Sequence, residues 1–102
     1  MAIRINDYAK PEGLRASRPY YKWRVFVDEP QEVLNSIETV EYTLHPTFPE
    51  PHQVRTDPAD GFALETSGWG EFNILVTIRY KDGREVQTQH WLDLSRAWPV
   101  GA

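Results

Sequence analysis

The chain has 102 residues, a formal net charge of −4 and no cysteine, and aromatic residues make up 13% of it. This length corresponds to one domain, the aromatic content excludes a wholly disordered chain, and the absence of cysteine excludes disulfides and cysteine-ligated zinc. No apolar run approaches the ~20 residues that span a bilayer, and acidic residues outnumber basic ones. We therefore expect a domain that contacts neither membrane nor nucleic acid. We expect one cytoplasmic domain over residues 1–102, with its core at about 21–94.

Little regular structure is expected in the first part of the chain. Residues 2–5 alternate apolar and polar side chains as a short edge strand would. Residues that favour turns then interrupt any regular element, and these are Pro11, Gly13 and Pro19. From residue 21 the pattern changes, because residues 21–27 alternate with period two and are rich in aromatic and β-branched side chains. This stretch predicts the first long strand.

Strands separated by turn signals continue through the rest of the chain. After one helical turn or loop at 31–36, the strands are predicted at 37–44, 54–56, 62–66, 72–80 and 85–94. Imperfect alternation at Glu38-Thr39 indicates a β-bulge, and Asp82-Gly83 marks a hairpin tip. Three prolines exclude regular structure from 45 to 52. Short strands without a long helix are typical of an all-β sandwich or barrel.

An enzymatic or metal site finds little support in the sequence. No serine lies in a glycine-flanked turn, and no carboxylate is placed to orient the ring of His45. No third metal ligand stands at a recognisable spacing from His45 and His52. His52 and His90 are therefore expected to be surface or ladder residues. We expect no catalytic activity, no metal and no cofactor.

Two loops carry the unusual residue combinations. The first, at 44–49, holds an imidazole, a hydroxyl and an aromatic ring in chain stiffened by proline, and the second, at 67–72, holds an indole between two glycines. These candidate binding residues are His45, Thr47, Phe48, Gly68, Trp69 and Gly70. Both loops follow strands, and such loops gather at one end of a sandwich, where binding sites often lie. Phe48 and Trp69 then form two walls of a slot, or they plug the end of the sandwich as core aromatics.

The two loops together resemble a known family. Val-Glu-Tyr-Thr-Leu-His-Pro-Thr-Phe-Pro-Glu-Pro at 40–51, followed about twenty residues later by Gly-Trp-Gly-Glu-Phe at 68–72, is similar to the paired motifs of the YEATS domain. Those motifs are Leu-His-x-Ser/Thr-Phe and Gly-Trp/Tyr-x-x-Phe. The stretches 23–27 and 90–94 are similar too, and the first motif with the short Lys-Asp-Gly hairpin looks most like the prokaryotic branch. The resemblance implies an immunoglobulin-like antiparallel β-sandwich.

YEATS domains read acylated lysine, notably acetyl- and crotonyl-lysine on histone tails. The resemblance places the acyl-lysine between Phe48 and Trp69, with the Thr47 hydroxyl meeting its amide. It also has the backbone N–H of Trp69 donate to the amide carbonyl, while His45 shapes the slot. The eukaryotic readers carry one more aromatic residue before the first-strand tryptophan. The peripheral candidates in this chain are Tyr20, which would replace that aromatic, and Glu71.

Two functions of different classes follow from these observations. The first is a module that binds acylated lysine on a protein or peptide partner. The alternative is a structural or protein-interaction β-sandwich that keeps both loops for packing and uses another surface. Open space between Phe48 and Trp69 favours the first function, and contact between the two rings favours the second.

Overall fold

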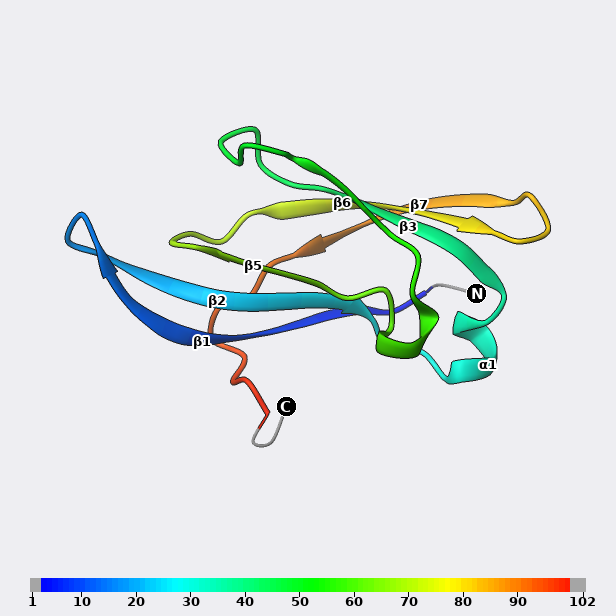
Figure 1. Ribbon diagram of the computed structural model, residues 1–102, viewed down its shortest axis with the longest axis horizontal. Helices are drawn as coiled ribbons and strands as arrows, with labels where there is room; N and C mark the ends of the chain where they lie inside the picture. Colours follow the sequence, from blue (N-terminus) through cyan, green and yellow to red (C-terminus); the bar gives the residue numbers. More distant parts are fainter. Residues whose placement is uncertain (1–2, 100–102) are drawn as a thin grey trace.

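Two antiparallel sheets face each other in the computed structural model, which describes residues 3–99 (Figure 1). The first sheet has the strand order β1-β2-β5, with bounds Ile5–Arg15, Arg18–Val27 and Leu64–Gly68. The second has the order β4-β3-β6-β7, with bounds His52–Arg55, Ile37–Thr43, Asn73–Tyr80 and Glu85–Trp91. The helical segments are α1 at Gln31–Leu34 and the 3-10 helix η1 at Pro58–Asp60. The predicted immunoglobulin-like antiparallel β-sandwich is confirmed.

Alternation along the central strands supplies the core between the sheets. From Trp23 onward in β2 and from Ile74 onward in β6, every second side chain up to Val27 and Ile78 points inward and is at most 2% exposed. The inward residues are Trp23, Val25 and Val27 of β2, and Ile74, Val76 and Ile78 of β6. Full burial of such a side chain contributes about 1.5–3 kcal/mol. Among residues 3–99 no helix is long and apolar enough to cross a membrane.

Two of the predicted features are confirmed in detail. The strand predicted at 37–44 is β3, and its pairing with β6 shifts register between Ile37 and Thr39. This shift is the bulge that the imperfect alternation indicated. The hairpin between β6 and β7 turns at Asp82-Gly83, where Gly83 adopts a φ of 93° that favours glycine.

The strands whose ends differ from the predicted ranges include β4, β5 and β7. β4 begins at His52, which pairs with Thr43, so the predicted irregular segment is one residue too long. β5 begins only at Leu64 because Phe62 adopts a left-handed φ of 57° and prolongs the preceding turn. It continues to Gly68, into the predicted loop. β7 ends at Trp91 instead of residue 94, since the chain enters a turn there.

The largest error concerns the N-terminal hairpin, where interrupted structure was expected. β1 runs through Pro11 and Gly13, and its pairing with β2 continues to the hairpin tip. Proline is tolerated because β1 is an edge strand, and a register shift between Pro11 and Gly13 forms a bulge in which Gly13 has a φ of 110°. The edge strand predicted at 2–5 begins only at Ile5, and Ala2 lies outside the described residues. Figure 1 shows this hairpin projecting beyond the sandwich at the left.

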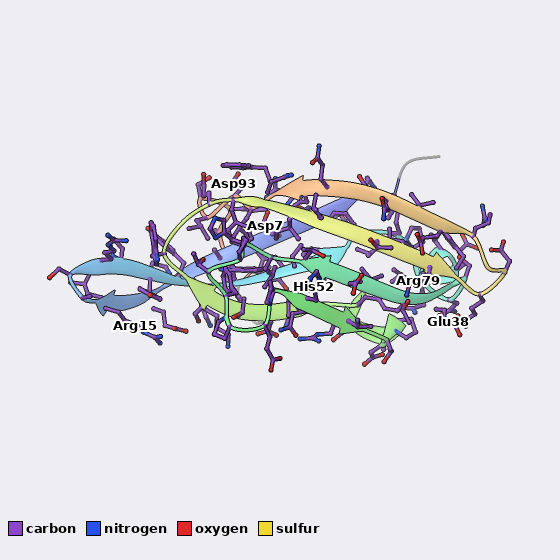
Figure 2. The ribbon with its side chains drawn as sticks, turned by 90° about the horizontal axis from the view of Figure 1, so that it is seen from above. Asp7, Arg15, Glu38, His52, Arg79 and Asp93 are labelled. Atoms are coloured by element: carbon purple, nitrogen blue, oxygen red, sulfur yellow. The ribbon has the colours of Figure 1, made fainter. Side chains whose placement is uncertain are left out.

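A buried carboxylate joins the two sheets at the β1 and β7 edges. Asp7 is 0% exposed, and its Oδ1 lies 2.6 Å from His90 Nε2 and accepts the Asp93 N–H at 3.2 Å. Figure 2 shows Asp7 and Asp93 close together at this side, with Arg15 at the distant hairpin tip. His90 is a ladder residue, as expected. Its bond to Asp7 was not predicted, because nothing local in the sequence marks two residues so far apart in the chain as partners.

Candidate functional site

A pocket of about 170 Å³ opens at the end of the sandwich where the two candidate loops meet. Its lining residues are His45, Thr47, Phe48, Gly68, Trp69, Gly70, Glu71 and Phe72. The structure therefore brings the six candidate binding residues together, although they come from separate loops. Phe72 was not among the predicted site residues. Its place at the end of the second motif was the signal that could have found it.

Other hollows are wider but lack this arrangement. One of about 310 Å³ lies along the edges of β4 and β5 and is lined by Phe48 together with the charged residues Glu50, Arg55 and Glu65. Another of about 590 Å³ lies beside Trp98, near the end of the described chain. Neither combines aromatic rings from two loops with glycine backbone. Size alone therefore does not identify the candidate site.

His45 and Thr47 form a local hydrogen-bonded unit at the pocket. The Thr47 N–H donates to His45 Nδ1 at 3.2 Å, and Thr47 Oγ1 lies 2.9 Å from the same nitrogen. A ring nitrogen that accepts an N–H carries no proton, so this network assigns the hydroxyl as a second donor to Nδ1. The lone pairs of the Thr47 hydroxyl then remain free. The pocket therefore holds a hydrogen-bond acceptor fixed in place by the imidazole.

Phe48 continues the aromatic core up to the pocket. Its ring centroid lies 6.3 Å from that of Trp23 at an interplanar angle of 85°, and 5.5 Å from that of Phe72 at 49°. Trp23 is 0% exposed. Tilted and edge-to-face pairs of this kind contribute ~0.5–1.5 kcal/mol each beyond their buried area. Phe48 is therefore both a pocket wall and a packed residue, so the two alternatives for its ring are not exclusive.

Trp69 also lines the pocket and is much more exposed than Phe48. Its side chain is 55% exposed, and within residues 3–99 the aromatic ring pairs that include Phe48 do not include Trp69. Trp69 is therefore not packed against Phe48 as a core aromatic would be. Neither Gly68 nor Gly70 has a positive φ, so the conformation of this loop does not require glycine. A Cβ on Gly68 would lie 3.5 Å from Phe48 Cζ and would narrow the pocket.

The two peripheral candidates differ in position. Tyr20 does not line the pocket, because its ring lies under the guanidinium of Arg15 on the hairpin, 4.9 Å away. Glu71 lies at the pocket rim. Its carboxylate accepts the Leu94 N–H at 2.9 Å and the Trp91 indole N–H at 3.4 Å. Glu71 therefore ties the second loop to the chain that follows β7.

The histidines outside the pocket bind protein groups. His52 Nδ1 lies 3.2 Å from Thr43 Oγ1 on the neighbouring strand, and His90 bonds to Asp7. Within residues 3–99 no three histidine, aspartate or glutamate side chains are grouped as metal ligands would be.

Relatives of known sequence match most of this chain. The Protein AF-9 homolog of Eremothecium gossypii is 39% identical over 72 residues, which cover 69% of this chain and 34% of that protein. The Protein AF-9 homolog of Candida glabrata is 40% identical over 81 residues, which cover 78% and 35%. The chain thus spans about a third of the length of these curated relatives.

Solved structures match the fold and most of its length. The Yaf9 YEATS domain recognizing an H3K122suc peptide has a TM-score of 0.73 and 25% identity, covering 93% of this chain and 78% of that chain. The Yaf9 YEATS domain bound to H3K27ac has a TM-score of 0.70 and 25% identity, covering 92% and 76%. A family model described as the prokaryotic YEATS domain matches residues 21–93. This match includes both loops that line the pocket, and the chain belongs to the family of prokaryotic YEATS domains.

Proposed function

We propose that this domain binds acylated lysine on a protein or peptide partner, in the pocket between Phe48 and Trp69. The observation that carries the proposal is a pocket whose lining includes Phe48, Trp69 and Thr47. Its volume of about 170 Å³ equals that of about six water molecules, which is enough for the end of an acylated lysine side chain. The similar Yaf9 domains recognise acylated peptides.

The polar groups at the pocket match a neutral amide. In this proposal the amide N–H of the acyl-lysine donates to Thr47 Oγ1, whose lone pairs are free. The backbone N–H of Trp69 donates to the amide carbonyl, and among the described residues no backbone hydrogen bond engages that N–H. A ligand amide buried here has one partner for its donor and one for its acceptor. Such pairing avoids the ~1–3 kcal/mol that an unsatisfied buried polar group costs.

The aromatic walls favour a flat acyl group over a bare ammonium. Stacking of a planar amide on each ring contributes ~0.5–1.5 kcal/mol, and a conjugated crotonyl tail extends the stacked surface. The unmodified lysine lacks the amide, so the Thr47 hydroxyl and the Trp69 N–H lose their partners, and its ammonium gives up part of its hydration. We therefore propose that crotonyl-lysine binds at least as well as acetyl-lysine. Two stacking faces and two hydrogen bonds, less the association penalty, correspond to a Kd of ~10 μM to ~1 mM.

The proposed binding requires no catalytic group, metal or cofactor. A reading module binds its ligand without a chemical step, so we propose no catalytic role, no metal and no cofactor for these residues. Because this chain has a formal net charge of −4, an acylated protein is a better partner for it than nucleic acid. We treat residues 21–94 as the core of one such module in the cytoplasm.

A titration with matched peptides tests the proposal. Peptides of one sequence carry acetyl-, crotonyl- or unmodified lysine at their centre, and calorimetry measures each Kd. We expect both acylated peptides to bind at least ~10-fold more tightly than the unmodified one, because the latter loses both amide hydrogen bonds. Equal binding of all three peptides, or none, would favour a structural or protein-interaction sandwich that retains the fold without reading acyl groups.

A further inference from the structure

An arginine from the N-terminal hairpin lies over the exposed wall of the pocket. The guanidinium carbon of Arg18 is 4.5 Å from the ring centroid of Trp69. Trp69 lines the pocket, whereas Arg18 does not. The guanidinium therefore packs on Trp69 without lining the pocket itself.

The hairpin geometry brings Arg18 to this position. The ladder between β2 and β5 ends at the pair Tyr21–Gly68. Beyond this pair, β2 leads back to the hairpin tip and β5 leads on into the second loop, so both segments lie at the same end of the ladder. The tip is a two-residue turn in which Ala16 and Ser17 have φ values of 51° and 65°. Arg18 is the first residue of β2 after this turn. This hairpin, which the local sequence pattern does not predict, thus places a cation over Trp69.

The charge of Arg18 is not neutralised by a nearby carboxylate. Within residues 3–99 the ion pairs of the hairpin include Arg15 with Glu12 at 3.2 Å, but none includes Arg18. Arg15 also lies over a ring, that of Tyr20, at 4.9 Å. The two hairpin arginines are therefore similar in setting, except that Arg15 is paired with Glu12 and lies over Tyr20, which is not a pocket residue.

We infer that Arg18 is a positioning and selectivity residue of the acyl-lysine pocket, an inference that rests on the proposed function. A cation over an indole is attracted to it, so Arg18 orients Trp69 for stacking. A second cation brought into the pocket beside the same ring would be repelled by the first. The neutral acyl amide meets no such repulsion. Arg18 thus favours acylated over unmodified lysine from outside the pocket.

Four variants of the full chain test this inference: Arg18→Ala, Arg18→Lys, Arg18→Glu and, as the matched control, Arg15→Ala. Each is titrated with crotonyl-lysine and unmodified peptides of one sequence, by calorimetry and by NMR at millimolar peptide. Arg18→Ala should weaken crotonyl-lysine binding by about two- to fivefold, the worth of an exposed cation–π contact. Arg18→Lys should restore most of it, and Arg15→Ala should match the wild type.

Two further readouts separate this role from a general loss of structure. Without peptide, Arg18→Ala should shift the indole N–H resonance of Trp69, assigned by its absence in Trp69→Phe, while thermal unfolding stays unchanged. Arg18→Glu should lower the preference for crotonyl over unmodified lysine the most, because it replaces repulsion of the ammonium by attraction.

The outcomes distinguish this inference from the proposed function. If the wild type binds no acylated peptide, the proposed function fails and the inference fails with it. If the wild type binds but Arg18→Ala binds equally well, or Arg18→Glu discriminates as the wild type does, only the inference about Arg18 is overturned. An Arg18→Lys variant as weak as Arg18→Ala would also overturn it, since a lysine keeps the cation.

Discussion

The two aromatic walls of the pocket are held in different ways. Phe48 packs against Phe72 and the fully buried Trp23, whereas Trp69 stands on a loop, is 55% exposed and lies under Arg18. Phe48 thus belongs to the core of the domain, whereas Trp69 lies on its surface. The comparison separates residues that fold the domain from residues that only shape the pocket, and it predicts different consequences of changing each.

The largest combined effect is expected for Phe48→Ala. Truncation of a buried phenylalanine costs about 3–5 kcal/mol. Phe48 is half-buried, so we expect a loss of ~1–3 kcal/mol in the free energy of unfolding together with loss of acyl-lysine binding. Urea unfolding and peptide titration measure the two effects, with Val54→Ala at a half-exposed strand position as control. Unchanged stability would show that Phe48 is not part of the core.

For Trp69→Ala we expect the loss of binding without the loss of stability. The indole makes few contacts that fold the chain, so the free energy of unfolding should change by less than ~0.5 kcal/mol. Affinity for crotonyl-lysine should fall at least ~10-fold as a stacking wall disappears. Leu75→Ala, at another exposed apolar position, controls for surface truncation. If Trp69→Ala unfolds the domain instead, Trp69 is a core plug and the contrast between the walls is wrong.

Thr47→Val should produce an intermediate effect on binding alone. Valine keeps the shape of threonine but removes the acceptor that faces the ligand amide. Leaving that amide N–H unpaired costs ~1–3 kcal/mol, so affinity should fall by about fivefold or more, whereas Thr47→Ser should bind within about twofold of the wild type. Calorimetry with crotonyl-lysine peptide measures both. Equal affinity of Thr47→Val and wild type would show that the Thr47 hydroxyl does not bind the ligand amide.

The smallest effect concerns the strand that leads to the Trp69 wall. The hydrogen bond from Arg24 of β2 lowers the pKa of Glu65 of β5 below its ordinary value of 4.5. Since the folded-state pKa is depressed, the pair stabilises the fold above that value and is lost as the pH falls through the folded-state pKa. The carboxylate is 35% exposed, so screening limits its contribution to less than ~1 kcal/mol.

Urea unfolding of wild type and Glu65→Gln checks this contribution. At pH 7 the variant should be slightly less stable, and the difference should shrink as the pH falls below about 4. A difference that is the same at pH 7 and pH 3 would mean that the ion pair is not its cause.

Most of the strands and turns were predictable from patterns of neighbouring residues. Period-two alternation and turn residues predict strands from nearby residues alone, and the strand ends erred where a backbone conformation such as the left-handed Phe62 was not visible in residue types. The N-terminal hairpin was missed because Pro11 and Gly13 are tolerated only through an edge position and a bulge. Both of these depend on the neighbouring strand.

The candidate site was predictable to the extent that two local motifs mark it. The loops that carry Phe48 and Trp69 were found from their sequence. The place of Tyr20 under Arg15 was not, because it depends on the hairpin pairing. The contacts of Arg18 with Trp69 and of Asp7 with His90 join distant parts of the chain. Such contacts follow from tertiary packing, and no local pattern indicates them.

The most direct test of the central claim is an NMR titration of the 15N-labelled domain with a crotonyl-lysine peptide. We predict that the largest shifts fall on the backbone amides of the two pocket loops, and that the Trp69 amide moves downfield as its N–H donates to the ligand carbonyl. Shifts confined to the outer face of the β4-β3-β6-β7 sheet, or no shifts at millimolar peptide, would contradict the claim that the space between Phe48 and Trp69 binds acylated lysine.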